Sequence, residues 1–288
     1  MYAFDASNMA GKTLVAYETV TLDGEEIVPD NDINNLDHTI YFPGVKTTAL
    51  GQETKDHISK ADEETVIVDT VEYSGLRIGK KYTVEGTLMD KETGKAVLDN
   101  DGKEITASET FKTDIESGTI DITFKFNGSN LKGKTVVAFE TILYKDKEYA
   151  THADLTDTDQ TIHFPEIGTT AADVKTNTGL ALAEKDMTIT DKVEYKNLLV
   201  GKEYTVKGTL MNKDTGKALE INGVKVTAEK TFTAESENGT VDLSFTFDGS
   251  ALAGETLVVF ENLYYNGVSV AVHKDLEDEN QIPGAITY

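Results

Sequence analysis

The chain has 288 residues, no cysteine, and a formal charge of −24 from 51 acidic and 27 basic side chains. The absence of cysteine excludes disulfides, thiolate zinc sites and cysteine nucleophiles. The acidic charge repels phosphate backbones and anionic lipids, so we expect neither nucleic acid nor a membrane as a partner.

Residues 1–43 match the end of the repeat that follows them. The string FDASNMAGKTLVAYETV matches FNGSNLKGKTVVAFETI, and LDHTIYFP matches DQTIHFP, which places Asp30 where His152 stands and His38 where Gln160 stands. We interpret 1–43 as the C-terminal half of an incomplete module. Because half a sandwich exposes core face and strand edges, we expect this half to be disordered, to be packed against something, or to pair with a half from another chain.

Residues 44–165 and 166–288 are two complete copies of one module, about 122 residues apart. In the first copy, alternating polar and apolar residues predict strands at 65–73, 81–89, 107–113, 118–126, 134–144 and 160–164. Turn strings such as KETGK and DNDGK separate them. Short strands without helical stretches predict an all-β fold of tandem immunoglobulin-like β-sandwich domains. The short links at 43–46 and 165–168 lead us to expect a rod.

Five polar residues recur in both copies. They are Thr47, Asp69, Glu140, His152 and Gln160 in the first copy, and Thr169, Asp191, Glu261, His273 and Gln281 in the second. Taken alone, a threonine facing a glutamine is normally a simple hydrogen bond, and each of the other three is an ordinary strand or loop residue. Their joint recurrence favours a shared chemical role.

These residue types suit the attack of a hydroxyl on an amide. Such a reaction needs a base for the hydroxyl proton, stabilisation of the oxyanion, and an acid for the departing ammonia. We expect the first and last strands to lie side by side, which brings Thr47 to Gln160. Two close carboxyls share a proton, so Asp69 and Glu140 are candidates to polarise the Gln160 carbonyl. His152 is the candidate to carry the proton from Thr47 to the nitrogen.

Several short motifs together resemble a known family. VAFE at 137–140 and VVFE at 258–261, TTA near the start of each copy, D-x-V-E-Y at 69–73 and 191–195, and a histidine eight positions before a glutamine carry the likeness. They resemble the Thr–Gln ester-bond domains, including VaFE-type repeats, of Gram-positive surface adhesins. The resemblance covers residues 45–281.

The resemblance implies two autocatalytic intramolecular esters, Thr47 to Gln160 and Thr169 to Gln281. The helpers would be Asp69, Glu140 and His152, with Asp191, Glu261 and His273 in the second copy. It favours the first threonine of each TT pair, and strand alternation lets only one threonine of a pair point inward. The second copy ends QIPGAITY instead of QTIHFP, so we expect a shorter last strand and a less complete ester there.

The resemblance also implies a role. We expect a stalk or spacer of a bacterial adhesin, extracellular and cell-wall anchored in the full-length protein, with no turnover of an external substrate. Its partners would be neighbouring modules and an unidentified host-surface ligand, and the chain would be a monomer. The sequence shows no signal peptide and no apolar run long enough to span a membrane, and we expect it to be an internal stretch of a longer protein.

Several alternatives stay open. An isopeptide-linked stalk needs a reactive lysine in the first strand and an asparagine in the last, where this chain has threonine and glutamine. A ligand-binding adhesin module without cross-links is a second alternative, and an external hydrolase, for which no G-x-S-x-G motif is found, is a third. We expect no cofactor. Calcium is an alternative for the aspartate-rich stretches at 154–159 and 275–280, where a solvated loop is the ordinary interpretation.

Overall fold

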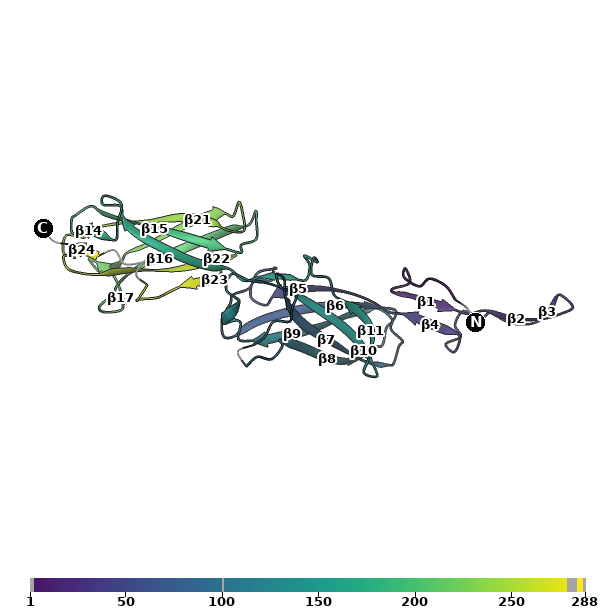
Figure 1. Cartoon of the computed structure of the whole chain (residues 1–288). Helices are drawn as coiled ribbons and strands as arrows, with labels where there is room; N and C mark the ends of the chain where they lie inside the picture. The colour runs from purple at the N-terminus through teal and green to yellow at the C-terminus, as the bar shows by residue number, and fades with distance from the viewer. Residues whose placement is uncertain (1–2, 100, 279–283, 287–288) are drawn as a thin grey trace. The chain divides into compact units, whose positions relative to one another are not determined.

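The computed structural model describes residues 3–99, 101–278 and 284–286. Within these residues every element is a strand except η1, a 3-10 helix at Ser129–Leu131 (Figure 1). No helix in the described part of the chain is long and apolar enough to cross a membrane. The prediction of an all-β chain is confirmed.

Residues 44–165 form a sandwich of two sheets. Its strands are β5 (Gly44–Gly51), β6 (Thr65–Ser74), β7 (Lys81–Asp90), β8 (Thr106–Lys112), β9 (Gly118–Phe126), β10 (Thr135–Tyr144), β11 (Lys147–His152) and β12 (Thr161–His163). One sheet has the order β5–β6–β9, and the other has the order β11–β10–β7–β8, with β12 paired to β10. The candidate residues therefore come from both sheets.

The second copy repeats this arrangement. Its strands are β13 (Glu166–Asp173), β14 (Leu180–Leu182), β15 (Met187–Lys196), β16 (Glu203–Asn212), β17 (Lys217–Ala218), β18 (Glu220–Ile221), β19 (Val224–Lys225), β20 (Thr227–Thr233), β21 (Gly239–Phe247), β22 (Leu257–Tyr265), β23 (Val268–His273) and β24 (Gly284–Ile286). The sheets are β13–β15–β21 and β17–β16–β22–β23, with β20 paired to β16. The parallel pair of β14 and β24 corresponds to a parallel bridge between Ile58 and His163 in the first copy.

Strand alternation explains which side chains form the core. In β6, the sequence TVIVDTVEYS alternates buried and less buried residues from Thr65 to Tyr73, with Ile67 and Val71 fully buried. The same alternation places Asp69 among these apolar side chains, because it occupies the same face. The alternation of this strand therefore buries the Asp69 carboxyl group among apolar side chains.

Residues 3–43 form two small antiparallel pairs. Strand β1 (Lys12–Val15) pairs with β4 (Thr39–Phe42), and β2 (Glu18–Leu22) pairs with β3 (Glu25–Asp30). The β2–β3 turn, Asp23-Gly24, has positive φ at both residues, as does the β10–β11 turn at Lys145-Asp146. Two such residues match the twist of a hairpin, so the two hairpins share one design.

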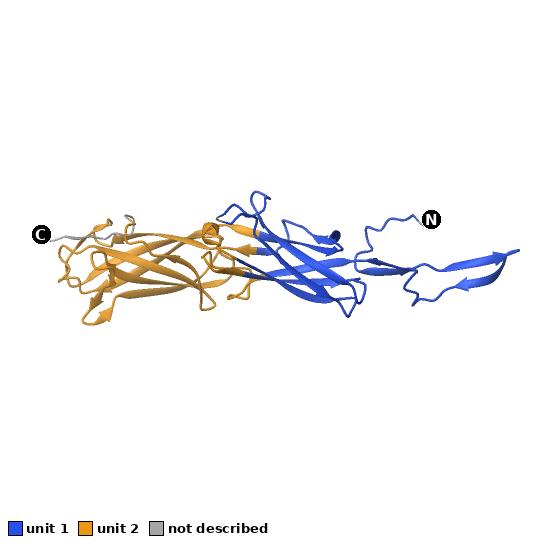
Figure 2. Cartoon of the chain, turned by 90° about the horizontal axis from the view of Figure 1, so that it is seen from below, with its two compact units in different colours: residues 1–49, 67–125, 137–161 blue, residues 50–66, 126–136, 162–288 orange. Residues whose placement is uncertain are grey.

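The chain divides into two compact units (Figure 2). Unit 1 comprises residues 1–49, 67–125 and 137–161, and unit 2 comprises residues 50–66, 126–136 and 162–288. All five candidate residues of the first copy lie within unit 1. Those of the second copy that the structure describes lie within unit 2.

Candidate functional site

Strand β5 turns the first threonine of its TT pair inward. Thr47 is 1% exposed, whereas Thr48 is only half-buried because successive residues face opposite sides of the strand. In the second copy Thr169 is buried and Thr170 is exposed. The inward threonine is in both cases the one that the sequence analysis favoured.

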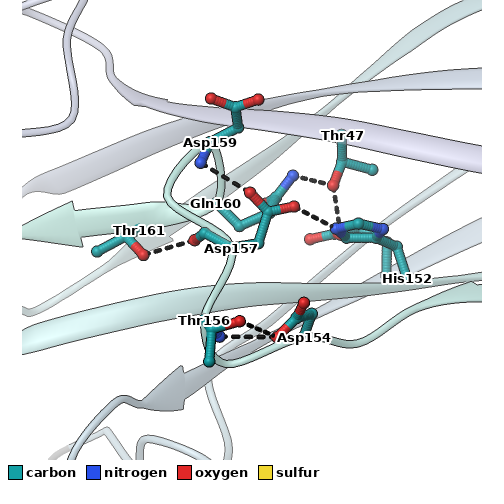
Figure 3. Close-up of polar contacts among 9 residues, drawn as sticks. Thr47, His152, Asp154, Thr156, Asp157, Asp159, Gln160 and Thr161 are labelled. Carbon is teal, nitrogen blue, oxygen red and sulfur yellow. Dashed lines mark hydrogen bonds and ion pairs between the residues drawn. The ribbon is translucent and has the colours of Figure 1, made fainter.

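Gln160 lies directly before β12 and faces Thr47. Backbone hydrogen bonds hold the segment, since Ala49 N donates to Asp159 O at 2.9 Å and Ala138 N donates to Gln160 O at 3.1 Å. The Gln160 side chain is fully buried, and its amide nitrogen donates to Thr47 Oγ1 (Figure 3). Two side chains 113 positions apart in sequence thus contact each other in the core.

The two segments that carry this pair lie beside each other without forming a ladder. The sequence analysis expected the first and last strands side by side. In the sheets β5 pairs with β6 and β12 pairs with β10. The backbone hydrogen bond from Ala49 to Asp159 nevertheless places the segment directly before β12 next to β5, and Thr47 meets Gln160 there.

A buried pair of carboxyls adjoins the Thr47–Gln160 contact. Glu140 on β10 and Asp69 on β6 are 1% and 0% exposed, and Thr47 Oγ1 donates to Glu140 Oε2 at 2.8 Å. Burial raises the pKa of Asp69 to about 6. Burial, and next the neighbouring Asp69 charge, raise the pKa of Glu140 further. Both shifts have the direction expected for two acids sharing a proton away from water.

His152 enters the site from β11. It is the register partner of Glu140 across the β10–β11 ladder. Its Nε2 lies 2.7 Å from Asp157 Oδ2, a contact visible in Figure 3. The sequence analysis did not single out Asp157 as a candidate, because it lies in an aspartate-rich loop whose members look alike. The spacing of five residues from the histidine, repeated in the second copy, was the available signal.

Carboxylates of the aspartate-rich loop accept hydrogen bonds from backbone amides of the same loop. Asp154 Oδ1 accepts from Thr156 N at 2.8 Å, and Asp157 Oδ1 accepts from Asp159 N at 2.8 Å. In the described part of the chain, no group of three or more histidine, aspartate or glutamate side chains is arranged to hold a metal ion.

The second copy brings the same residue types together. Asp191 is fully buried, and burial raises its pKa to about 6, while the Glu261 and Thr169 side chains hydrogen-bond to it. Glu261 is the register partner of His273, whose Nε2 lies 2.9 Å from Asp278 Oδ2. Gln281 lies outside the described residues.

Residues 3–43 hold only remnants of the site. Glu18 and Asp30 are register partners, as are Glu140 and His152 in the first copy. His38 Nδ1 lies 3.3 Å from Asp30 Oδ2. Glu18, the equivalent of Glu140, is exposed to solvent. This segment therefore has one acid of the site but does not bury it.

These features define a class of protein: tandem all-β sandwiches, each with a threonine, two acids and a histidine converging in its core. The family described as T-Q ester bond containing domain matches residues 2–42, 43–164 and 165–282. The chain belongs to this family.

Comparison with solved structures gives distant similarities. Two crystal forms of a bacterial adhesin from Mobiluncus mulieris, described as containing intramolecular disulfide, isopeptide and ester bond cross-links, are 16% and 17% identical. Each match has a TM-score of 0.34 and covers 76% of this chain and 80% of the adhesin chain. A glycosyl hydrolase family 2 member from Bacteroides cellulosilyticus is 11% identical, with a TM-score of 0.29 over 72% of this chain and 28% of its own. A search of curated proteins gave no match.

Proposed function

We propose that each complete copy forms an intramolecular ester in its own core, Thr47 to Gln160 and Thr169 to Gln281. The observation that carries the proposal is the buried contact between the Thr47 hydroxyl and the Gln160 amide beside the Asp69–Glu140 pair. Thr47 Oγ1 attacks the Gln160 side-chain carbonyl carbon, the C–N bond breaks, and ammonia leaves. Threonine loses one proton and ammonia gains it, so no oxidant or other reactant is needed.

The surrounding groups divide the proton transfers between them. The Thr47 hydroxyl already donates to Glu140, so the acidic pair receives the proton first. Among the described residues Gln160 Oε1 has no hydrogen-bond partner, which leaves it open to the proton held by the pair as negative charge develops there. His152, oriented by Asp157, passes a proton to the departing nitrogen.

The enclosure of the site supports self-modification over turnover of an external substrate. Thr47, Asp69, Glu140 and Gln160 are each at most 1% exposed, so no separate substrate reaches the hydroxyl. The reaction is therefore a single turnover in which the protein is both catalyst and product. We place the chain outside the enzymes for this reason.

The ester would covalently join the first strand of each copy to the segment that leads into its last strand. By the entropy estimate used for disulfides, closing a loop of about 100 residues is worth roughly 4.7 kcal/mol. The tie would also let a pulling force bypass the hydrogen bonds of the strands. We infer a spacer segment of a bacterial surface adhesin, extracellular and held to the cell wall by the full-length protein. Neighbouring modules would be its structural partners, and the host-surface ligand is unidentified.

Intact mass under denaturing conditions tests the proposal. We expect the purified chain to be lighter than its sequence by two ammonia molecules, and Thr47→Ala or Thr169→Ala to restore one each. Thr48→Ala is the matched control, because that neighbour does not face Gln160, and it should keep both losses. A wild-type mass equal to the sequence would refute both esters.

A further inference from the structure

Asn197, directly after β15, has a buried and fully hydrogen-bonded side chain. It is 6% exposed, and its backbone is left-handed, with a φ of 61°. Its amide nitrogen donates to Lys134 O at 2.5 Å and to Phe164 O at 3.3 Å. Its Oδ1 accepts from Thr135 Oγ1 at 2.9 Å and lies 2.8 Å from His163 Nδ1. The amide thus bonds four residues of the first copy, all of which lie in unit 2 together with Asn197.

The four partners of Asn197 lie at the ends of the two strands that hold the first Thr–Gln site. Two of them are at the start of β10, which carries Glu140, and two are at the end of β12, which directly follows Gln160. The backbone pairing of the same ends includes the bond from Phe164 N to Lys134 O, at 2.9 Å. The Asn197 amide therefore stabilises the end of the strand pair that presents Gln160.

Side chains of the second copy also contact the other neighbour of β12, the segment 56–58. His163 N, at the end of β12, donates to His57 O at 2.9 Å. The preceding residue, Asp56, accepts a hydrogen bond from Tyr265 Oη and pairs with Lys202 Nζ at 3.2 Å. These residues too lie in unit 2. Both neighbours of β12 are therefore held by residues of the second copy.

The first copy has a glycine at the position of Asn197. Aligning VEYSGL with VEYKNL places Gly75 there, and its φ of 66° gives the same left-handed backbone. Glycine adopts this conformation readily and has no side chain. The turn after the strand therefore does not require asparagine, and what Asn197 adds is its four side-chain hydrogen bonds.

We propose that two residues of the second copy, Asn197 and Tyr265, are positioning residues for the ester of the first copy. This inference rests on the proposed ester reaction. A misplacement of about 1 Å slows a reaction between fixed groups on the order of a hundredfold, so Gln160 must be held accurately against Thr47. The strand β12 has three residues and few backbone hydrogen bonds of its own to do this. Folding of the second copy therefore speeds ester formation in the first.

The test follows each ammonia loss separately, by intact mass of the full chain sampled at intervals after synthesis. Thr169→Ala leaves only the first ester to form, and Thr47→Ala leaves only the second. Asn197→Gly should slow the first loss at least about fivefold, because it keeps the left-handed backbone but removes the side-chain hydrogen bonds. The second loss should keep its rate, although Asn197 belongs to the second copy. Asn222→Gly, at an exposed left-handed asparagine of the same copy, is the matched control and should alter neither rate.

A second variant removes a single hydroxyl on the other side of β12. Tyr265→Phe keeps the ring against Tyr204, with centroids 5.3 Å apart, but loses the hydrogen bond to Asp56. It should also slow the first loss alone, and it decides by the same comparison if Asn197→Gly does not fold. An unchanged first loss, or an equal slowing of both losses as a general loss of stability would cause, would overturn the inference. Absence of any ammonia loss from the unsubstituted chain would instead refute the esters themselves.

Discussion

At the scale of single residues, the buried acids are what make the threonine and glutamine more than a hydrogen-bonded pair. A lone Thr–Gln contact satisfies two polar groups and needs nothing further. Here Glu140 accepts from the same hydroxyl, and Asp69 lies beside it with a raised pKa. Two acids in an apolar core carry a cost in stability that ordinary packing does not require. The proposed ester reaction would account for that cost.

The histidine-bound aspartate gives a kinetic prediction. Asp157→Asn should slow ester formation at least about tenfold, because the amide no longer stabilises a protonated His152 or fixes its ring. The measurement is the cross-linked fraction, by intact mass, in protein sampled at intervals after synthesis. Asp159→Asn changes an exposed residue of the same loop and should leave the rate unaltered. Equal rates for the two variants would remove Asp157 from the mechanism.

The acidic pair gives a pH prediction for protein without the first ester. In Thr47→Ala, the folded state keeps a proton on Asp69 above the ordinary pKa of 3.8, up to the raised value of about 6. Across that window the folded state binds more protons than the unfolded chain, so stability should fall as pH rises. Unfolding in urea at pH 4 and pH 7 measures the difference. Adding Asp69→Asn should reduce the dependence by removing the contribution of Asp69, while the raised pKa of Glu140 keeps the rest. An unchanged slope would show that Asp69 is not protonated in the folded state.

At the scale of elements, strand alternation was enough to predict which threonine of the pair points inward, but not which strands form ladders with each other. Thr47 and Thr48 could be told apart because successive residues face opposite sides. Which strand ends up opposite β5 depends on sheet pairing between distant segments, and the sequence pattern is the same for either partner. Asp157 was missed for a related reason, since a loop aspartate that holds a histidine has the same local signature as one that faces solvent.

A glycine in the central strand provides an element-scale prediction. Gly208 on β16 lies opposite Glu261, and a Cβ added there would approach Phe245 to 2.6 Å and Leu243 to 2.9 Å. Gly208→Ala should therefore lower the free energy of unfolding by about 1–3 kcal/mol. At Gly168 on β13 an added Cβ meets no atom within 4 Å, so Gly168→Ala should change it by less than about 0.5 kcal/mol. Urea unfolding of both variants makes the comparison, and equal losses would contradict it.

At the scale of the whole molecule, the repeat was the most predictable feature. A spacing of about 122 residues, shared by five polar positions, is enough to define both complete copies from the amino-acid sequence alone. The burial of side chains in residues 3–43 was less predictable, because exposure of Val20 and Ile40 depends on which strands are present to cover them. The same sequence pattern is core in one copy and surface in another.

The complete burial of Gln160 has a consequence for how the molecule ages. Water has little access to an ester at that position, so the bond should be long-lived. If it is ever hydrolysed, the Thr47 hydroxyl returns but the ammonia does not, and position 160 becomes a glutamate. A third acid then faces Asp69 and Glu140, and their mutual repulsion would loosen the core. If the proposed ester forms, it can therefore form only once, and a glutamate at position 160 found by peptide sequencing of aged protein would be the sign of its hydrolysis.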